Sequence, residues 1–343
     1  ELARVELPTG GAIEYDWDGF GSVQANGFKN SVVGSGSGPA GIYRRVVERR
    51  VYADGTTLTE KTRYQETQVN GNAVVTVDQL TPSDTLLART KHYFYSYALL
   101  SFGSQNPYSA ISHEDPFNGR EYQTETYQSD GVTLLRKTED TWQARTSYPN
   151  QYGSPGSLAV DLRITATKNT LADTNQIGQK TITYSADEYN NQTDVYEYDF
   201  GNGAVGSLIR RTHTDYLASG YDTIVGGLSA PDPNATIHLR SLPTQSIVYD
   251  AANNQKARTA YEYDNYSVTT NHAVILNRAN ISGLASRTGA TVAQGYNAPA
   301  DTMRGNATAV TSYANAAAGT GAVTTYAQYD IAGNVVKTVD ANG

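Results

Sequence analysis

The chain has 343 residues, enough for one large domain or two ordinary ones, and its formal net charge is −8. This acidic balance argues against a nucleic-acid binder, which needs a basic face to contact phosphate. The absence of Cys excludes a disulfide scaffold, a thiol nucleophile and a cysteine-ligated zinc site.

The composition predicts an all-β fold. The chain contains 26 Tyr and 31 Gly but only 1 Met, and 17% of its residues are charged. Tyrosine favours strands, whereas the long side chains that favour helices are scarce. The best apolar stretch, residues 93–102, is interrupted by Ser96 and is too short to cross a bilayer, so no transmembrane segment is predicted.

A tyrosine-led segment recurs along the chain, and each copy reads as a β-hairpin. Each has an aromatic, β-branched strand, a turn of Asp, Asn or Gly residues that tolerate positive φ, and a returning strand. In chain order the predicted hairpins cover residues 52–64, 127–142, 184–199, 249–264 and 329–343, with turns at Asp54-Gly55, Asp130-Gly131, Asn190-Asn191, Asn253-Asn254 and Gly333-Asn334.

These hairpins must pack together, because a lone hairpin is only marginally stable in water. Alternation in the returning strands places Tyr196 and Tyr198 on one face, and likewise Tyr261 and Tyr263. We expect antiparallel strands to hold at least half of the residues. Residues 34–41, 148–156 and 226–234 read as loops, and residues 314–318 are the best helix candidate, ended by Gly319 and Gly321.

Two of the hairpins resemble a known repeat. The segments Tyr249-Asp250-Ala251-Ala252-Asn253-Asn254 and Tyr329-Asp330-Ile331-Ala332-Gly333-Asn334 are similar to the tyrosine–aspartate (YD) repeat of bacterial RHS proteins. The copies at Tyr127-Gln128 and Tyr184-Ser185 lack the aspartate and are degenerate. The residues that the repeat pattern marks as structural are Tyr196, Tyr198, Asp199, Tyr249, Asp250, Asn253, Asn254, Tyr261, Tyr263, Asp264, Tyr329, Asp330, Gly333 and Asn334.

The resemblance runs from about residue 7 to residue 343, and it carries expectations about fold and setting. It implies antiparallel hairpin repeats that form one continuous spiralling sheet or hollow β-shell over residues 1–343, within a longer, exported bacterial protein. In toxin-carrying members the shell encloses a C-terminal cargo domain. The strand signals at residues 335–339 and 3–7 are then expected to meet further repeats or a neighbouring subunit.

No residue stands out as catalytic, cofactor-binding or metal-binding. The five histidines, His92, His113, His213, His238 and His272, show no zinc-ligand spacing. His213 and Asp215 would share a strand face, which hydrogen bonding alone explains. The Asp115-Pro116 and Asp232-Pro233 pairs read as turns, because neither continues into the family's self-cleaving motif.

The leading functional hypothesis is a non-catalytic, extracellular or envelope-associated β-shell module that encloses, displays or adheres. One alternative is the repeat shell of a polymorphic toxin around its cargo. Another is an adhesin that binds cell-surface glycans, or a glycan-acting enzyme with Glu114 and Asp115 as paired carboxylates. Tyrosine abundance alone does not separate these, because tyrosine is in any case a good strand former.

Overall fold

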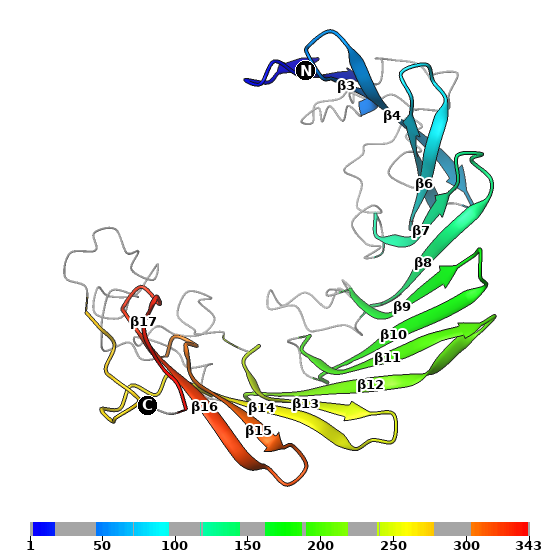
Figure 1. Cartoon of the computed structure of the whole chain (residues 1–343). Coiled ribbons are helices and arrows are strands. Elements are labelled where there is room, and N and C mark those ends of the chain that lie inside the picture. Colours follow the sequence, from blue (N-terminus) through cyan, green and yellow to red (C-terminus); the bar gives the residue numbers. More distant parts are fainter. Residues whose placement is uncertain are drawn as a thin grey trace, which may run out of the picture. The chain divides into compact units, whose positions relative to one another are not determined.

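A computed structural model describes residues 3–17, 46–70, 72–95, 117, 119–144, 162–186, 190–218, 239, 241–277 and 303–341. Strands make up 66% of this part of the chain, and it contains no helix (Figure 1). The prediction of an all-β fold of antiparallel hairpins is therefore confirmed. The described residues include no helix that is long and apolar enough to span a membrane. Residues 34–41, 148–156 and 226–234 lie outside the described part.

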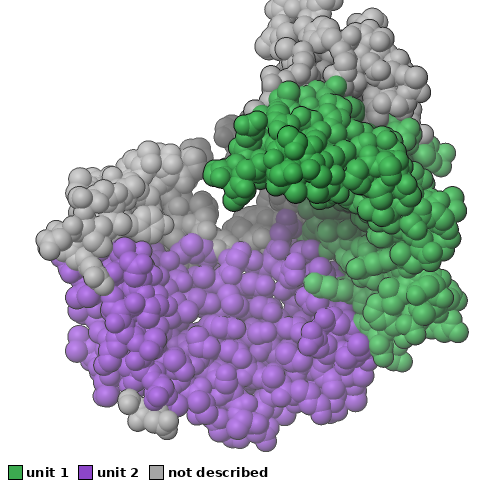
Figure 2. All heavy atoms as spheres, turned by 45° about the horizontal axis from the view of Figure 1, so that its top comes forward, with its two compact units in different colours: residues 1–181, 198–207 green, residues 182–197, 208–343 purple. Residues whose placement is uncertain are grey.

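The chain divides into two compact units, coloured separately in Figure 2. The first comprises residues 1–181 and 198–207, and the second comprises residues 182–197 and 208–343. Three strands, β10 (Gln176–Tyr184), β11 (Gln192–Asn202) and β12 (Val205–Tyr216), therefore contribute to both. The strands are β1 Arg4–Glu6, β2 Ala12–Trp17, β3 Val46–Tyr52, β4 Leu58–Val69, β5 Asn72–Leu80, β6 Leu86–Phe94, β7 Glu121–Tyr127, β8 Leu134–Gln143, β9 Arg163–Leu171, β10 Gln176–Tyr184, β11 Gln192–Asn202, β12 Val205–Tyr216, β13 Pro243–Asp250, β14 Gln255–Tyr263, β15 Ala307–Asn315, β16 Thr320–Tyr329 and β17 Val335–Val339.

In the first unit each strand from β1 to β10 pairs antiparallel with the next strand along the chain. Directly opposed residues share a face of the sheet, so the register builds rows of side chains across the strands. One such row has alternating charge over much of its length and contains Asp16, Glu48, Arg63, Asp78 and Arg89 on β2 to β6.

In the second unit the strands from β12 to β17 pair in the same way. Residues 264–277 pack against this sheet without forming a strand. Gln328 donates its side-chain amide to the carbonyl of Asn271 at 3.0 Å, and Leu276 donates its N–H to the carbonyl of Tyr329 at 2.9 Å. The packing buries a small apolar core that includes Ile275, Ala309 and Val339.

Four turns share one hydrogen-bond pattern. In residues 7–11, 81–85, 250–254 and 330–334, the first residue donates its N–H to the fifth carbonyl, and the fourth donates to the first carbonyl. The fourth residue, a Gly, Asp or Asn, has a positive φ in every copy. This is the geometry of a type I turn followed by a left-handed residue, which suits hairpins.

The structure has turns at the predicted positions, but the strands begin and end at other residues than predicted. Turns occur at Asp54-Gly55, Asp130-Gly131, Asn253-Asn254 and Gly333-Asn334, and Asn190-Asn191 lies between β10 and β11. Each repeat tyrosine lies at the end of the outgoing strand instead of opening it, as the last residue or, for Tyr249, the last but one. The expectation that residues 329–343 hold a whole hairpin is therefore wrong, because Tyr329 is the last residue of β16.

The helix candidate at residues 314–318 is also wrong. Asn315 ends β15 and residues 316–319 form a turn, in which the Asn315 side chain accepts the N–H of Ala318 at 3.1 Å. Positive φ at Gly319 and Gly321 then turns the chain into β16. The short alanine run joins two paired strands, and it lacks the length that helix nucleation needs.

Candidate functional site on strands β7 to β10

The predicted repeat residues lie in several separate turns and strands. Asp250 accepts the backbone N–H groups of Ala252 and Asn254, at 3.0 and 2.8 Å. Asp330, which is almost fully buried, does the same for Ala332 and Asn334, at 3.0 and 2.9 Å. These aspartates close hairpin turns, with Asn253 and Gly333 as the left-handed residues.

Asp264 holds a different junction. Its carboxylate accepts the backbone N–H groups of residues 304, 305 and 306 at 2.6 to 2.9 Å, together with the hydroxyl of Tyr266. It thus fixes the start of residues 264–277 against the start of β15. The other marked residues lie within strands: Tyr196, Tyr198 and Asp199 on β11, and Tyr261 and Tyr263 on β14.

Among the described histidines, His213 makes the interaction expected from its sequence position. Its Nε2 lies 3.1 Å from Asp215, and its Nδ1 lies 2.8 Å from Asp194 on the neighbouring strand β11. Both ring nitrogens are therefore engaged by carboxylates. His113, His238, Glu114, Asp115 and the Asp232-Pro233 pair lie outside the described residues.

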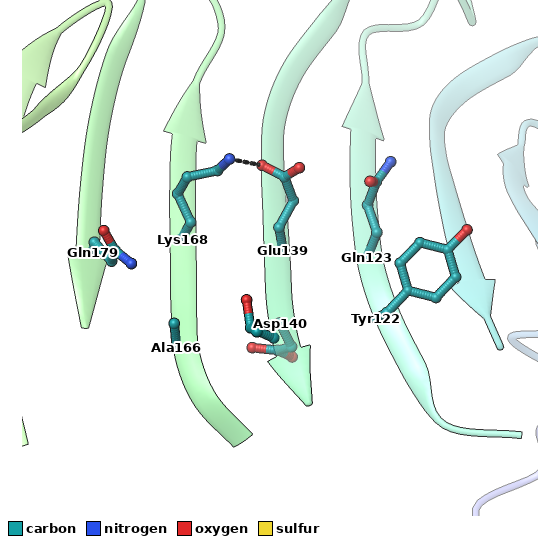
Figure 3. A pocket seen from close by; sticks show the side chains of 8 residues that line it. Tyr122, Gln123, Glu139, Asp140, Ala166, Lys168 and Gln179 are labelled. Atoms are coloured by element: carbon teal, nitrogen blue, oxygen red, sulfur yellow. Dashed lines mark ion pairs between the residues drawn. The ribbon is translucent and has the colours of Figure 1, made fainter. Parts of the chain in front are cut away.

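A polar groove crosses four strands of the first unit and is a candidate site. Its volume is about 340 Å³. Figure 3 shows Gln123, Glu139, Lys168 and Gln179 in a row across β7, β8, β9 and β10. The lining residues are Tyr122, Gln123, Glu139, Asp140, Thr141, Ala166, Lys168 and Gln179.

Local backbone irregularity shapes this groove. Tyr93 opposes Gln123 while Phe94 opposes Glu121, so Tyr122 is an extra, bulged residue on β7. The Tyr122 ring packs against the Tyr95 ring at the edge of the groove, with 4.5 Å between the centroids and 32° between the ring planes. The small Ala166 side chain opposite Thr141 leaves the surface hollowed between larger neighbours.

Charges in and beside the groove are paired with one another. Glu139 lies 2.8 Å from Lys168 and 3.0 Å from Lys137. Burial would raise the pKa of Glu139, but hydrogen bonds from these two lysines outweigh it and lower the pKa below its ordinary value. Glu139 is therefore an ionised partner of lysine and has no proton to donate as a general acid at neutral pH.

Beside the groove, Glu125 accepts hydrogen bonds from the hydroxyls of Tyr93 and Tyr127. Burial and then the contact with Glu125 raise the pKa of Tyr127 to about 12 and also raise that of Tyr93. Both hydroxyls stay protonated at physiological pH. Gln123 donates its amide to the same carboxylate at 2.9 Å, so this side of the groove is rigidly bonded.

The groove is not evident from the sequence. Three of its residues, Glu139, Asp140 and Thr141, fall within the predicted hairpin at residues 127–142, but none is a residue that the repeat pattern marks, and the lining meets only through the register of four strands. The single signal in the sequence is the alternation of polar side chains along residues 121–127 and 134–143, which is typical of any strand with a polar face.

Within the described residues, no group of three or more His, Asp or Glu side chains is placed to hold a metal ion. Comparison with protein-family models and with curated proteins gave no match to this chain.

Proposed function

We propose that the chain is a non-catalytic structural module, a wall of stacked antiparallel hairpins within an exported or surface-attached bacterial protein of the RHS-repeat type. Its role would be to shield or display a neighbouring chain. The resemblance of the segments at residues 249–254 and 329–334 to tyrosine–aspartate repeats supports the family, and the recurring turn supports the hairpin as the building unit.

One observation carries the proposal: side chains that could perform chemistry are engaged in holding strands together. His213 bridges two carboxylates across β11 and β12. In the first unit Arg89 forms two hydrogen bonds with Asp78 on the adjacent strand, at 2.7 and 2.8 Å. Such cross-strand pairs stabilise a sheet, so a structural role accounts for these groups.

The mechanism of a wall is geometric. Each hairpin adds two strands, a polar side chain such as Asp250, Asp330 or Thr81 fixes the reversal in several of the turns, and pairs of opposite charge join neighbouring strands. The sheet then presents one face to a passenger and the other to solvent. The passenger could be a C-terminal cargo domain, as in the toxin-carrying relatives that the repeat motif resembles.

A protease-protection experiment tests this function. A small, protease-sensitive reporter is fused after residue 343 of the whole chain, and its digestion by proteinase K is followed on gels. A shielding wall predicts digestion at least tenfold slower than that of the same reporter and linker on an unrelated carrier of equal size. Digestion of the reporter at the carrier's rate, while the wall itself stays intact, would contradict the proposal.

A further inference from the structure

The groove on β7 to β10 differs from the rest of the polar ladders because it is hollow. Elsewhere in the first unit, opposed long side chains such as Arg63 and Glu48 meet across the strands, here at 3.0 Å. Here Ala166 and Thr141 are opposed instead, and the space above them stays open. A volume of about 340 Å³ lies at the lower end of the range for ligand pockets.

The charges of the groove indicate the charge of its ligand. Lys168 and Lys137 both pair with Glu139, and with Asp140 these four groups sum to no net formal charge. Asp140 accepts the hydroxyl of Thr167 at 2.6 Å and is also occupied. A charged ligand of either sign gains no net attraction from this balanced set, and one that displaced a partner would leave the other uncompensated, which is costly. The groove therefore favours a ligand without net charge.

The hydrogen-bonding groups indicate its chemistry. The amide of Gln179 makes no hydrogen bond to another described residue and offers both a donor and an acceptor. Lys168 is 40% exposed and retains further N–H donors beyond its bond to Glu139. Hydroxyl groups suit such a surface, because each can donate and accept. The Tyr122 ring adds an apolar surface at one end.

The row of side chains across the four strands also sets the length of the site. Gln123, Glu139, Lys168 and Gln179 lie on four adjacent strands, and three inter-strand spacings span roughly 14 Å. This is an elongated site that runs across the strands. We propose that the groove binds a short, neutral oligosaccharide, whose hydroxyls bond to the row and whose ring C–H groups pack on Tyr122. This site goes beyond the wall function and does not depend on it.

Two variants and one control test the site on the whole chain. Ala166→Phe fills the groove with a residue that suits a strand, and Gln179→Ala removes the unbonded amide. Gln176→Ala is the matched control, because Gln176 is an exposed amide on the same strand that does not line the groove. Each protein is applied to an array of neutral and anionic oligosaccharides, and hits are measured by calorimetry. Circular dichroism confirms that each variant is folded.

The proposal predicts that the wild-type chain and Gln176→Ala bind the same neutral oligosaccharides. Gln179→Ala is expected to weaken binding about tenfold, and Ala166→Phe to abolish it. An array with no neutral hit would overturn the proposal. So would binding only to anionic sugars, or binding to neutral sugars that survives in a folded Ala166→Phe variant. None of these outcomes bears on reporter protection, so the wall function is judged separately.

Discussion

Aspartate closes the hairpin turns of both tyrosine–aspartate segments by accepting backbone N–H groups. Hydrogen bonds from the Asn254 backbone and from Lys256 lower the pKa of Asp250 from 3.8 to about 2. A carboxylate with a depressed folded-state pKa contributes stability that is present above its unfolded pKa. That stability is lost as the pH falls through the folded value. The turn is therefore expected to weaken between about pH 4 and pH 2.

The isosteric change Asp250→Asn tests this. At pH 7 the variant should unfold about 1–3 °C below the wild-type chain, because a charge-assisted acceptor becomes a neutral one. The difference should shrink as the pH falls from 4 to 2, where the wild-type carboxylate also loses its charge. Thermal unfolding followed by circular dichroism across this pH range measures it. A difference that stays constant down to pH 2 would show that charge has no part in the turn.

The repeat tyrosine couples one hairpin to the next through a cation. The Arg211 guanidinium lies 4.4 Å from the centre of the Tyr249 ring on the neighbouring strand, and Lys91 lies 5.0 Å from the ring of Tyr127. Tyr249→Leu should cost about 0.5–1 kcal/mol beyond the effect of the change in packing, whereas Tyr249→Phe keeps the ring and most of the interaction. A double-mutant cycle with Arg211→Met in urea isolates the coupling. Zero coupling energy would mean that the ring and the cation merely lie close together.

At the scale of the element, the β11–β12 hairpin depends on two glycines that let its backbones approach closely. A Cβ added at Gly206 would lie 2.5 Å from the carbonyl oxygen of Asp199, and one at Gly201 would lie 2.7 Å from that of Ala204. Gly206→Ala should therefore destabilise the chain by about 1–3 kcal/mol through overpacking. Ser207→Ala, at the next and exposed position, should change stability by less than about 0.5 kcal/mol. Equal urea midpoints for the two variants would contradict the close approach.

Charge ladders join the strands of the first unit. Asp78 and Arg89 are both partly buried and form a bidentate pair between β5 and β6, a better geometry than most surface ion pairs have. A double-mutant cycle with Asp78→Asn and Arg89→Met should give a coupling of about 1 kcal/mol at low salt. Because the pair is not fully buried, 1 M NaCl should reduce it. A coupling below about 0.3 kcal/mol at low salt would argue against the ladder as a stabilising feature.

The turns show how much of the local structure can be predicted from the sequence. Asp-Gly and Gly-Asn pairs predict hairpin turns because few residues tolerate positive φ. The turn at residues 81–85 has the same geometry but was missed, because Thr81 stands where the motif has aspartate. Its hydroxyl accepts the Thr85 N–H at 3.0 Å, as the carboxylate does elsewhere. The sequence also does not show that the repeat tyrosines lie at the ends of strands and not at their starts, because a single residue type does not mark which end of a strand it occupies.

At the scale of the whole molecule, composition and repeated turns were enough to predict an all-β, antiparallel fold. The groove could not be predicted, because it needs the bulge at Tyr122, the register of four strands and the small side chain of Ala166. The spiral or hollow closure of the sheet stays a prediction. So do its further partners along β1 and β17, each of which pairs with one neighbour within the described chain.

Backbone hydrogen exchange tests the central claim, that the chain is a wall of hairpins coupled mainly to their neighbours. Wild-type amides within the paired strands should be protected, including the turn-closing amide of Asp250. Asp250→Asn should reduce protection most in β13 and β14, less in β12 and β15, and not in β3 to β6, as in a nearest-neighbour array. The account would be contradicted if strand amides of the wild-type chain exchanged at the rates of an unfolded chain. It would also be contradicted if Asp250→Asn reduced protection equally in all strands.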